Sequence, residues 1–180
     1  MDPVSGRGFY GIGIVGSKTP LNVGTLWRSA FAMDAAFIFT AGRRYPRQAS
    51  DTVKAYRHVP MFEFADTNAL WDAIPHDCVP VAVELDERAR SIDNYVHPER
   101  AIYILGAEDY GIQKAVLSRC RDIIQLPGCV CLNVATAGSI VMYDRYVKRG
   151  AVAQMVEHLS EKQGVAGSTP ARPTLIGSAA

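Results

Sequence analysis

Five short runs of mostly apolar residues constrain the fold of this chain more than any other feature. They lie at 10–15, 36–40, 79–85, 101–105 and 123–126. Each run is short enough for a strand, and continuous apolar character is typical of strands in a parallel sheet that helices cover on both faces. The sequence therefore predicts an α/β fold, with a parallel sheet flanked by helices.

Helical periodicity appears between these runs. After the first run, apolar residues recur at i, i+3, i+4, i+7 and i+8, at Val23, Leu26, Trp27, Ala30 and Phe31. This spacing places them on one face of a helix. Shorter helices are predicted around 70–74 and 112–117, and a closing helix over 133–148.

The overall composition bounds the function. The chain has 180 residues, 48% of them hydrophobic, and a net charge of only +1. Nucleic acid must therefore be held by a local basic patch, because the whole molecule supplies no strong attraction. We find no signal peptide and no apolar run that would span a bilayer, so we expect a cytoplasmic protein without a membrane partner. Its four cysteines would then stay reduced.

The end of the chain differs in composition from the rest. Gly150 is expected to break the closing helix, and 163–180 is rich in Gly, Ser, Thr, Pro and Ala. We predict a folded domain over 9–149 and a disordered appendage over 150–180.

Two short motifs carry chemistry, and each also has a purely structural interpretation. Arg28 lies one turn beyond Gly24 on the first helix, where its guanidinium could reach a phosphate, or it could be an ordinary solvated arginine after an Asn22 cap. Gly106 and Glu108 follow a buried strand. The Glu108 side chain could point into a ligand crevice, or it could simply stabilise a helix N-terminus through its negative charge.

The third motif compresses a strand, a turn and a helix start into 123–140. Pro127 and Gly128 end the strand, and Asn133 stands where a helix cap would. Main-chain groups of the loop 126–132 could bind an adenine edge. Asn133 could also tie this loop to the glycine turn, since its amide both donates and accepts hydrogen bonds.

The order and spacing of the three motifs resemble those of the SPOUT methyltransferases. The resemblance is to the SpoU (TrmH-like) branch, the RNA ribose 2′-O-methyltransferases, and it covers roughly 9–149. The motifs N-x-G-x-x-x-R, G-x-E and strand-Pro-x-loop-Leu-Asn-helix correspond here to Asn22/Gly24/Arg28, Gly106/Glu108 and Leu126/Pro127/Leu132/Asn133.

The resemblance implies a C-terminal trefoil knot, a homodimer and S-adenosyl-L-methionine as cofactor. The dimer would use apolar faces of the first and closing helices, with Trp27, Phe31, Tyr143 and Tyr146. The implied catalytic residues are Arg28, Asn22, Glu108 and Asn133. The implied cofactor-binding residues are Val83, Leu105, Gly106, Ile124, Leu126, Pro127, Cys131 and Leu132. Cys131 and Ala135 stand where the family often has serine, which removes two hydroxyls.

The chemistry then assigned to Arg28 is positioning. A guanidinium stays protonated, so we expect Arg28 to bind the phosphate beside the reacting ribose and orient its 2′-oxygen, with the proton passing to that phosphate or to water.

RNA contact is expected in one basic, irregular segment that also holds Tyr45 and Tyr56. Its cations are Arg43, Arg44, Arg47, Lys54 and Arg57. Such a mixture can pair with phosphates and stack on bases, although a solvated loop would look similar. Because minimal members of the family often act on tRNA, we favour tRNA over rRNA.

Other functional classes fit less well. Gly11, Gly13 and Gly16 match the dinucleotide fingerprint G-x-G-x-x-G, but they fall within a strand and the helix starts only after Pro20. A second alternative is an RNA-binding protein of the same fold that has lost its activity. It remains possible because Cys131 and Ala135 replace two serines that the family often has. We expect no metal, since Cys129 and Cys131 are not a C-x-x-C pair and the histidines are scattered.

Overall fold

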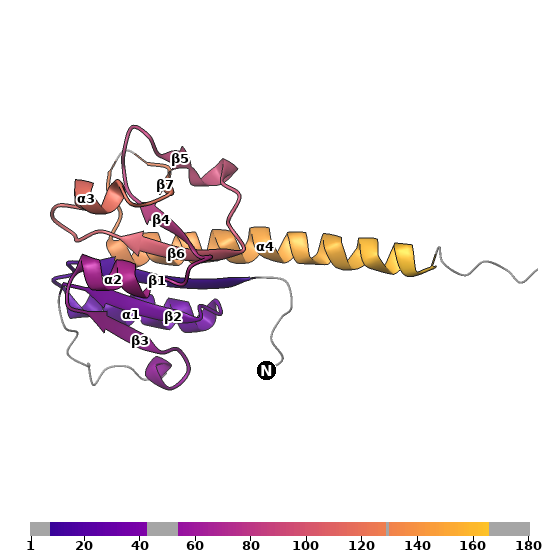
Figure 1. Ribbon diagram of the computed structural model, residues 1–180, viewed down its shortest axis with the longest axis horizontal. Coiled ribbons are helices and arrows are strands. Elements are labelled where there is room, and N and C mark those ends of the chain that lie inside the picture. The colour runs from indigo at the N-terminus through magenta and orange to yellow at the C-terminus, as the bar shows by residue number, and fades with distance from the viewer. Residues whose placement is uncertain (1–7, 43–53, 129, 166–180) are drawn as a thin grey trace, which may run out of the picture.

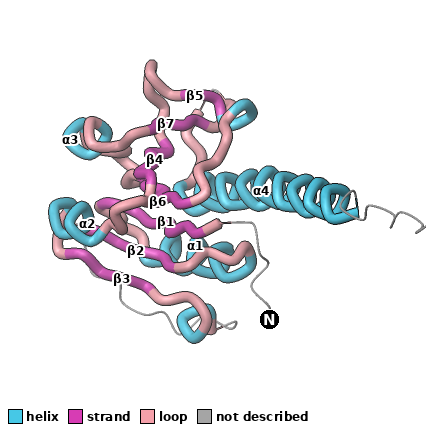
Figure 2. Tube along the Cα trace, turned by 45° about the vertical axis from the view of Figure 1, so that its right-hand side comes forward, coloured by secondary structure: helices cyan, strands magenta, loops and turns pink. Residues whose placement is uncertain are grey.

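The structure, a computed structural model, describes residues 8–42, 54–128 and 130–165. These residues form one sheet of seven strands in the order β3-β2-β1-β6-β4-β7-β5. Every neighbouring pair runs parallel, as the sequence predicts. Figure 2 shows the sheet from β5 at the top to β3 at the bottom. The strands are β1 (Phe9–Val15), β2 (Phe37–Ala41), β3 (Met61–Phe64), β4 (Val79–Val83), β5 (Arg90–Ser91), β6 (Arg100–Leu105) and β7 (Asp122–Gln125).

Helices cover both faces of this sheet. The α-helices among the described residues are α1 (Pro20–Ala32), α2 (Thr67–Ala73), α3 (Lys114–Leu117) and α4 (Val134–Val165), and two short 3₁₀ helices are η1 (Ala55–Arg57) and η2 (Ile92–Asn94). In Figure 1, α4 runs along the sheet and projects beyond it.

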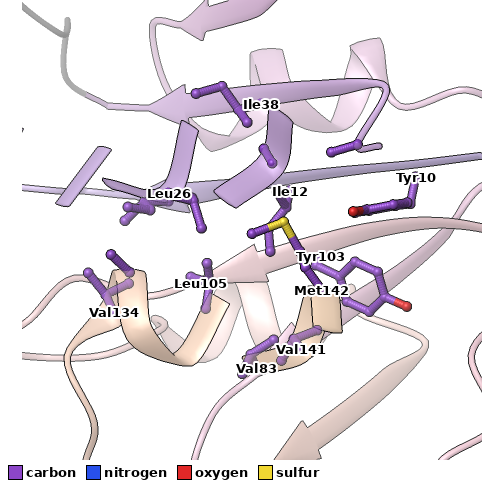
Figure 3. Packing of buried hydrophobic residues seen from close by; sticks show 14 of the residues in the cluster. Tyr10, Ile12, Leu26, Ile38, Val83, Tyr103, Leu105, Val134, Val141 and Met142 are labelled. Atoms are coloured by element: carbon purple, nitrogen blue, oxygen red, sulfur yellow. The ribbon is translucent and has the colours of Figure 1, made fainter. Parts of the chain in front are cut away.

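Alternate strand residues pack into two separate cores. On one face, side chains such as Ile12 and Leu105 meet Leu26 of α1 and Val141 of α4 (Figure 3). On the other face, residues such as Ile104 pack with side chains of α2 and α3. Because successive strand residues point to opposite faces, a sheet covered on both sides needs apolar residues throughout. This is why the central strands appear as continuous apolar runs.

The two outermost strands were not predicted from the sequence. β3 and β5 are the edges of the sheet. β3 contains Glu63 and leaves Phe62 exposed, and β5 has only two residues. An edge strand is less enclosed by neighbouring structure, so it lacks the apolar continuity that identified the other five.

The glycine fingerprint is a feature of β1 and not of a phosphate-binding turn. Gly11 and Gly13 lie within β1, and α1 starts only at Pro20, as predicted. A Cβ at Gly11 would lie 2.4 Å from the ring of Phe37, and one at Gly13 would lie 2.2 Å from the carbonyl oxygen of Phe39. Gly11 and Gly13 are therefore explained by the aromatic residues of β2 that lie over them. The expectation that Gly16 also lies within the strand is wrong, because β1 ends at Val15 and Gly16 follows it with φ +72°.

The predicted helix break at Gly150 is wrong. α4 continues through this residue to Val165. A single glycine costs about 1 kcal/mol relative to alanine, which an established helix can absorb because each further residue adds a hydrogen bond. The domain boundary at 149/150 stays a prediction, and 166–180 lies outside the described residues.

A buried polar cluster anchors α4 to the amino end of β6. Arg145 is only 1% exposed, and its guanidinium donates hydrogen bonds to the carbonyl oxygens of Pro98 (2.6 Å) and Glu99 (2.8 Å). Nearby, His97 bonds to the Tyr103 hydroxyl and to Asp144. Burial lowers the pKa of His97 despite its contact with Asp144, which favours a neutral imidazole at pH 7.

Candidate cofactor and active site

A cavity of about 620 Å³ opens at the carboxyl ends of β4, β6 and β7. This is where open parallel sheets bind ligands, since the loops that leave the strands converge there. Seven of the eight predicted cofactor-binding residues line it: Val83, Leu105, Gly106, Leu126, Pro127, Cys131 and Leu132. The sequence therefore located the cavity wall closely.

Ile124 is the exception. It is fully buried within β7 and belongs to the core beside α1 and α4, so it does not line the cavity. β7 ends at Gln125, and the cavity begins beyond it at Leu126. The assignment of Ile124 to cofactor binding, which the resemblance implied, is not supported by the cavity, because Ile124 lies inside β7 and the lining begins at Leu126.

Gly106 is required by its own loop. The backbones of Ala107 and Gly111 exchange hydrogen bonds of 3.2 and 3.0 Å, which closes a tight turn after β6. A Cβ at Gly106 would lie 2.2 Å from the carbonyl carbon of Gly111. Gly111 itself has φ +63°, which favours glycine. The turn at the cavity wall thus depends on two glycines.

Side-chain hydrogen bonds join the three sequence motifs at one point. Asn22 of α1 donates to Glu108 Oε1 over 2.5 Å, and Asn133 donates to Asn22 Oδ1 over 3.0 Å. Asn133 also accepts from the backbone N–H of Ala135 (2.9 Å), which caps α4. The cap considered for Asn133 is therefore present, and its link to the glycine turn is indirect, through Asn22. Residues separated by up to 111 positions form one network beside the cavity.

The network favours a charged Glu108. Burial opposes ionisation, but hydrogen bonds from backbone N–H groups, Asn22 and Thr19 outweigh it and lower the pKa of Glu108 below its ordinary 4.5. A second contact comes from the backbone N–H of Lys18, 3.4 Å from Oε2. At neutral pH the carboxylate is the acceptor that holds α1 to the turn after β6.

Acid should therefore weaken the fold through Glu108. Because its folded pKa is lowered, its stabilising contribution is fully present above the ordinary pKa and is lost as pH falls through the folded pKa. We expect the difference in unfolding free energy between the wild type and Glu108→Gln to shrink from about pH 6 to about pH 3. Urea unfolding across that range measures it, and a difference that does not change with pH would contradict the role given to Glu108.

Arg28 lies outside the cavity lining. It is exposed on α1, and it forms no hydrogen bond or ion pair with other residues in the described ranges. Its neighbour Ser29 shares a 2.8 Å hydrogen bond with Ser139 of α4. Within the described part of the chain, the Arg28 side chain is thus exposed and without a partner.

The described part of the basic segment packs beside α1. Lys54 and Arg57 are exposed around η1, and the ring of His58 stacks on Phe31 of α1 with centroids 4.3 Å apart. This segment therefore packs against α1, the helix that carries Arg28. The other three predicted RNA-binding residues, Arg43, Arg44 and Arg47, lie outside the described residues.

Trp27 does not belong to an exposed apolar face. It is 6% exposed, and its indole N–H donates to the carbonyl oxygen of Val59 over 2.8 Å. The assignment of Trp27 to a subunit interface is wrong, because the loop after η1 already covers it.

The cavity wall also holds polar residues outside the predicted set of site residues. Glu84 follows β4, while Asp109 and Tyr110 belong to the turn after β6. Lys18 pairs with Asp109 and lies 5.6 Å from the centre of the Tyr110 ring. The only signal was their position just after buried strands.

The described residues offer neither a metal centre nor a membrane-spanning helix. No group of three or more His, Cys, Asp or Glu side chains in these ranges could hold a metal ion. None of the helices in the same ranges has the length and apolarity needed to cross a membrane.

The fold and the cavity define an α/β protein with a ligand site at the carboxyl edge of a parallel sheet. Residues 11–143 match the family described as SpoU rRNA Methylase family. Since this match spans most of the chain, the protein belongs to that family of RNA methyltransferases. Among curated proteins, the sequence has no match.

Solved structures of low sequence identity share the fold. The SpoU methyltransferase AviRb from Streptomyces viridochromogenes is 21% identical with a TM-score of 0.71, and the match covers 83% of this chain and 62% of AviRb. AviRb has also been solved in complex with AdoMet. The A. aeolicus TrmH/SpoU tRNA modifying enzyme is 15% identical, with a TM-score of 0.71 and coverage of 89% and 90%.

A third structure concerns the 2-OH methylation of C/U34 on tRNA. It is 22% identical with a TM-score of 0.68, and the match covers 79% of this chain and 97% of that one. The present chain therefore spans nearly all of one relative but less than two thirds of another.

Proposed function

We propose that this protein is an S-adenosyl-L-methionine-dependent methyltransferase that modifies a ribose 2′-hydroxyl of RNA. The observation that carries the proposal is the network of Asn22, Glu108 and Asn133 beside the cavity. It unites the three motifs of the family at one place, and the helix that supplies Asn22 also carries the exposed Arg28. Calorimetric titration with S-adenosylhomocysteine is the direct test of the cofactor site.

The cavity has the chemistry that an adenosyl cofactor requires. Its volume lies in the usual range for small-molecule sites, and it combines apolar walls such as Val83 and Leu105 with backbone groups of the loop after β7. Of the two departures from the family, only Cys131 lines the cavity. Ala135 is buried in the core, so the second missing hydroxyl does not reduce direct cofactor contact.

Bound S-adenosyl-L-methionine would supply an activated methyl group, and the residues of the chain would position the RNA and the cofactor for the transfer. Asn22, Glu108 and Asn133 hold the loops around the cavity in one arrangement. Arg28 binds the phosphate next to the reacting nucleotide and orients the 2′-oxygen, since its guanidinium stays protonated. That phosphate or water takes the hydroxyl proton. The main contribution of the protein to such a transfer is to align the attacking 2′-oxygen with the methyl group.

Arg28→Ala should separate chemistry from cofactor binding. Because Arg28 does not line the cavity, we expect unchanged affinity for S-adenosylhomocysteine and a loss of methyl transfer of about a hundredfold. Titration calorimetry and transfer of a labelled methyl group to RNA measure the two effects. The matched control is Arg121→Ala, an exposed arginine before β7. Equal loss of binding and transfer would refute the positioning role.

Transfer RNA is the proposed substrate, with rRNA as the alternative. Two of the structural relatives are described by their connection with tRNA, and the 3₁₀ helix with the exposed cations packs beside α1, which carries Arg28. A substrate of this kind fits the expected cytoplasmic location. Labelled methyl transfer to total tRNA and to ribosomal RNA, compared in parallel, decides between the two.

A homodimer is proposed from the exposed face of α4. Ile140, Tyr143 and Val147 are 38%, 60% and 48% exposed and follow one another at helical spacing. Three large apolar side chains in a row are typical of an interface. Phe31 and Tyr146, each half-buried, are the other proposed contacts. Sedimentation equilibrium of the purified chain measures the assembly.

The trefoil knot implied by the family is also proposed. It is supported by the path of the chain after β7, which crosses from near one edge of the sheet to pack α4 against α1. At the crossing, a Cβ on Gly138 would lie 2.4 Å from Leu26 and 3.0 Å from Leu105. A crystal structure traced through residues 106–148 would establish the threading.

A further inference from the structure

Glu84 occupies a central place in the cavity wall. It directly follows β4, which lies between β6 and β7 in the sheet. Its backbone N–H donates to the carbonyl oxygen of Ile124 over 3.0 Å, which fixes this residue against β7. The side chain, half-buried, lines the cavity between the turn that begins at Gly106 and the loop that begins at Leu126.

The carboxylate of Glu84 is held in a defined orientation. Oε1 accepts from the backbone N–H of Leu85 over 3.0 Å, and Oε2 accepts from the backbone N–H of Ile112 over 2.7 Å. A Cβ at Gly111 would lie 2.4 Å from Oε2, so the glycine also makes room for this group. A carboxylate offers about four acceptor positions, and these contacts occupy two.

Three carboxylates line the cavity, and they differ in their partners. Glu108 is bonded to Asn22, and Asp109 is paired with Lys18. Glu84 has no cation within salt-bridge distance among the residues that the structure describes, only neutral N–H groups. It is thus an oriented acceptor with remaining capacity, in a wall where a ligand with hydroxyl donors would satisfy it.

We propose that Glu84 binds the vicinal ribose hydroxyls of the cofactor's adenosine, an assignment which rests on the methyltransferase function proposed above. An acidic side chain at the carboxyl end of a parallel strand is a known solution for holding a ribose diol. Adenine is expected against the loop after β7. The ribose bonded to it then falls beside the neighbouring strand end, where Glu84 stands.

The same carboxylate also makes Glu84 a link between cofactor and active site. It holds Ile112 at the end of the turn whose other side carries Glu108, and Glu108 binds Asn22. Binding of the cofactor in the cavity would therefore affect the position of α1 through the side chains of Glu84 and Glu108. Glu84 acts as a binding and positioning residue and takes no part in the transfer itself.

The test is a cycle in which both the protein and the ligand are altered. Titration calorimetry compares the wild type with Glu84→Gln, using S-adenosylhomocysteine and its 2′-deoxy and 3′-deoxy derivatives. Glu87→Gln, an exposed glutamate outside the cavity, is the matched control. 5′-Methylthioadenosine, which lacks the amino-acid end, serves as a further probe. Thermal unfolding of each variant reports on the fold.

We expect Glu84→Gln to bind S-adenosylhomocysteine about tenfold to a hundredfold more weakly, as for loss of hydrogen bonds to a charged group. The wild type should lose similar affinity when a ribose hydroxyl is removed, and that measurement needs no variant to fold. The loss caused by the substitution should shrink for the deoxy ligands and persist for 5′-methylthioadenosine.

Other outcomes overturn the assignment. Equal losses for the ribose and deoxy ligands would make Glu84 purely structural. A loss seen with S-adenosylhomocysteine but not with 5′-methylthioadenosine would place it on the ligand's ammonium group. If the wild type binds S-adenosylhomocysteine and Glu84→Gln binds equally well, only the ribose contact fails. If the wild type binds none of these ligands, the proposed cofactor function fails with it.

Discussion

Replacement of Gly106 by alanine is expected to weaken binding of S-adenosylhomocysteine by about tenfold to a hundredfold and to destabilise the fold by about 2 kcal/mol. The added Cβ would lie 2.2 Å from the carbonyl carbon and 2.6 Å from the carbonyl oxygen of Gly111. These are backbone atoms, so no change of rotamer relieves the conflict. The turn must move, and with it the cavity wall and Glu108.

Calorimetry and urea unfolding measure the two effects. Gly42→Ala is the matched control, because Gly42 has φ +86° but a Cβ added to it would meet no atom of the described residues within 4 Å, and it does not line the cavity. This variant should lose stability through backbone strain while keeping its affinity. Wild-type affinity in Gly106→Ala would show that the turn does not shape the cofactor site.

Arg145→Ala is expected to lower the free energy of unfolding by about 3 kcal/mol or more. The substitution removes the donors to the carbonyl oxygens of Pro98 and Glu99. The half-buried Pro98 loses this partner, whereas the Glu99 carbonyl keeps its 2.9 Å hydrogen bond from the backbone N–H of Phe9. It also empties the space beside the Tyr10 ring, whose centre is 4.8 Å from the guanidinium carbon. The loss therefore combines lost hydrogen bonds with a cavity.

Urea unfolding of Arg145→Ala and of Arg121→Ala gives the comparison. Arg121 is exposed, and its substitution should change stability by less than about 0.5 kcal/mol. Similar small changes in both variants would mean that water replaces the guanidinium without cost.

The central sheet could be predicted because its strands are buried on both faces and therefore continuously apolar. The same argument explains the failures at its edges, where Phe62 is exposed and β5 has only two residues. The helix break predicted at Gly150 was wrong because the low helix propensity of one glycine has only a small effect on the extension of a helix that has already formed. Local composition thus predicts strands that are buried on both faces, and it predicts edge strands and helix ends poorly.

The site was predictable where backbone geometry alone decides it. Glycine and proline at strand ends located Gly106 and Pro127, both in the cavity wall. Residue spacing could not distinguish Ile124, inside the strand, from Leu126, just past it. Nor could it show that Glu84 and Ile112 meet, because that contact depends on how three strands are ordered in space.

The wide separation in sequence of Asn22, Glu108 and Asn133 has a consequence for how the protein is made. Their bonds span 86 and 111 positions, so the network cannot close until Asn133 has been synthesised. A nascent chain that ends before α4 would hold α1 with its inner face incompletely covered and would lack one wall of the cavity. Contacts this distant also slow folding, because loop closure must precede them. The chain can thus bind the cofactor only after α4 has been synthesised and the network has closed.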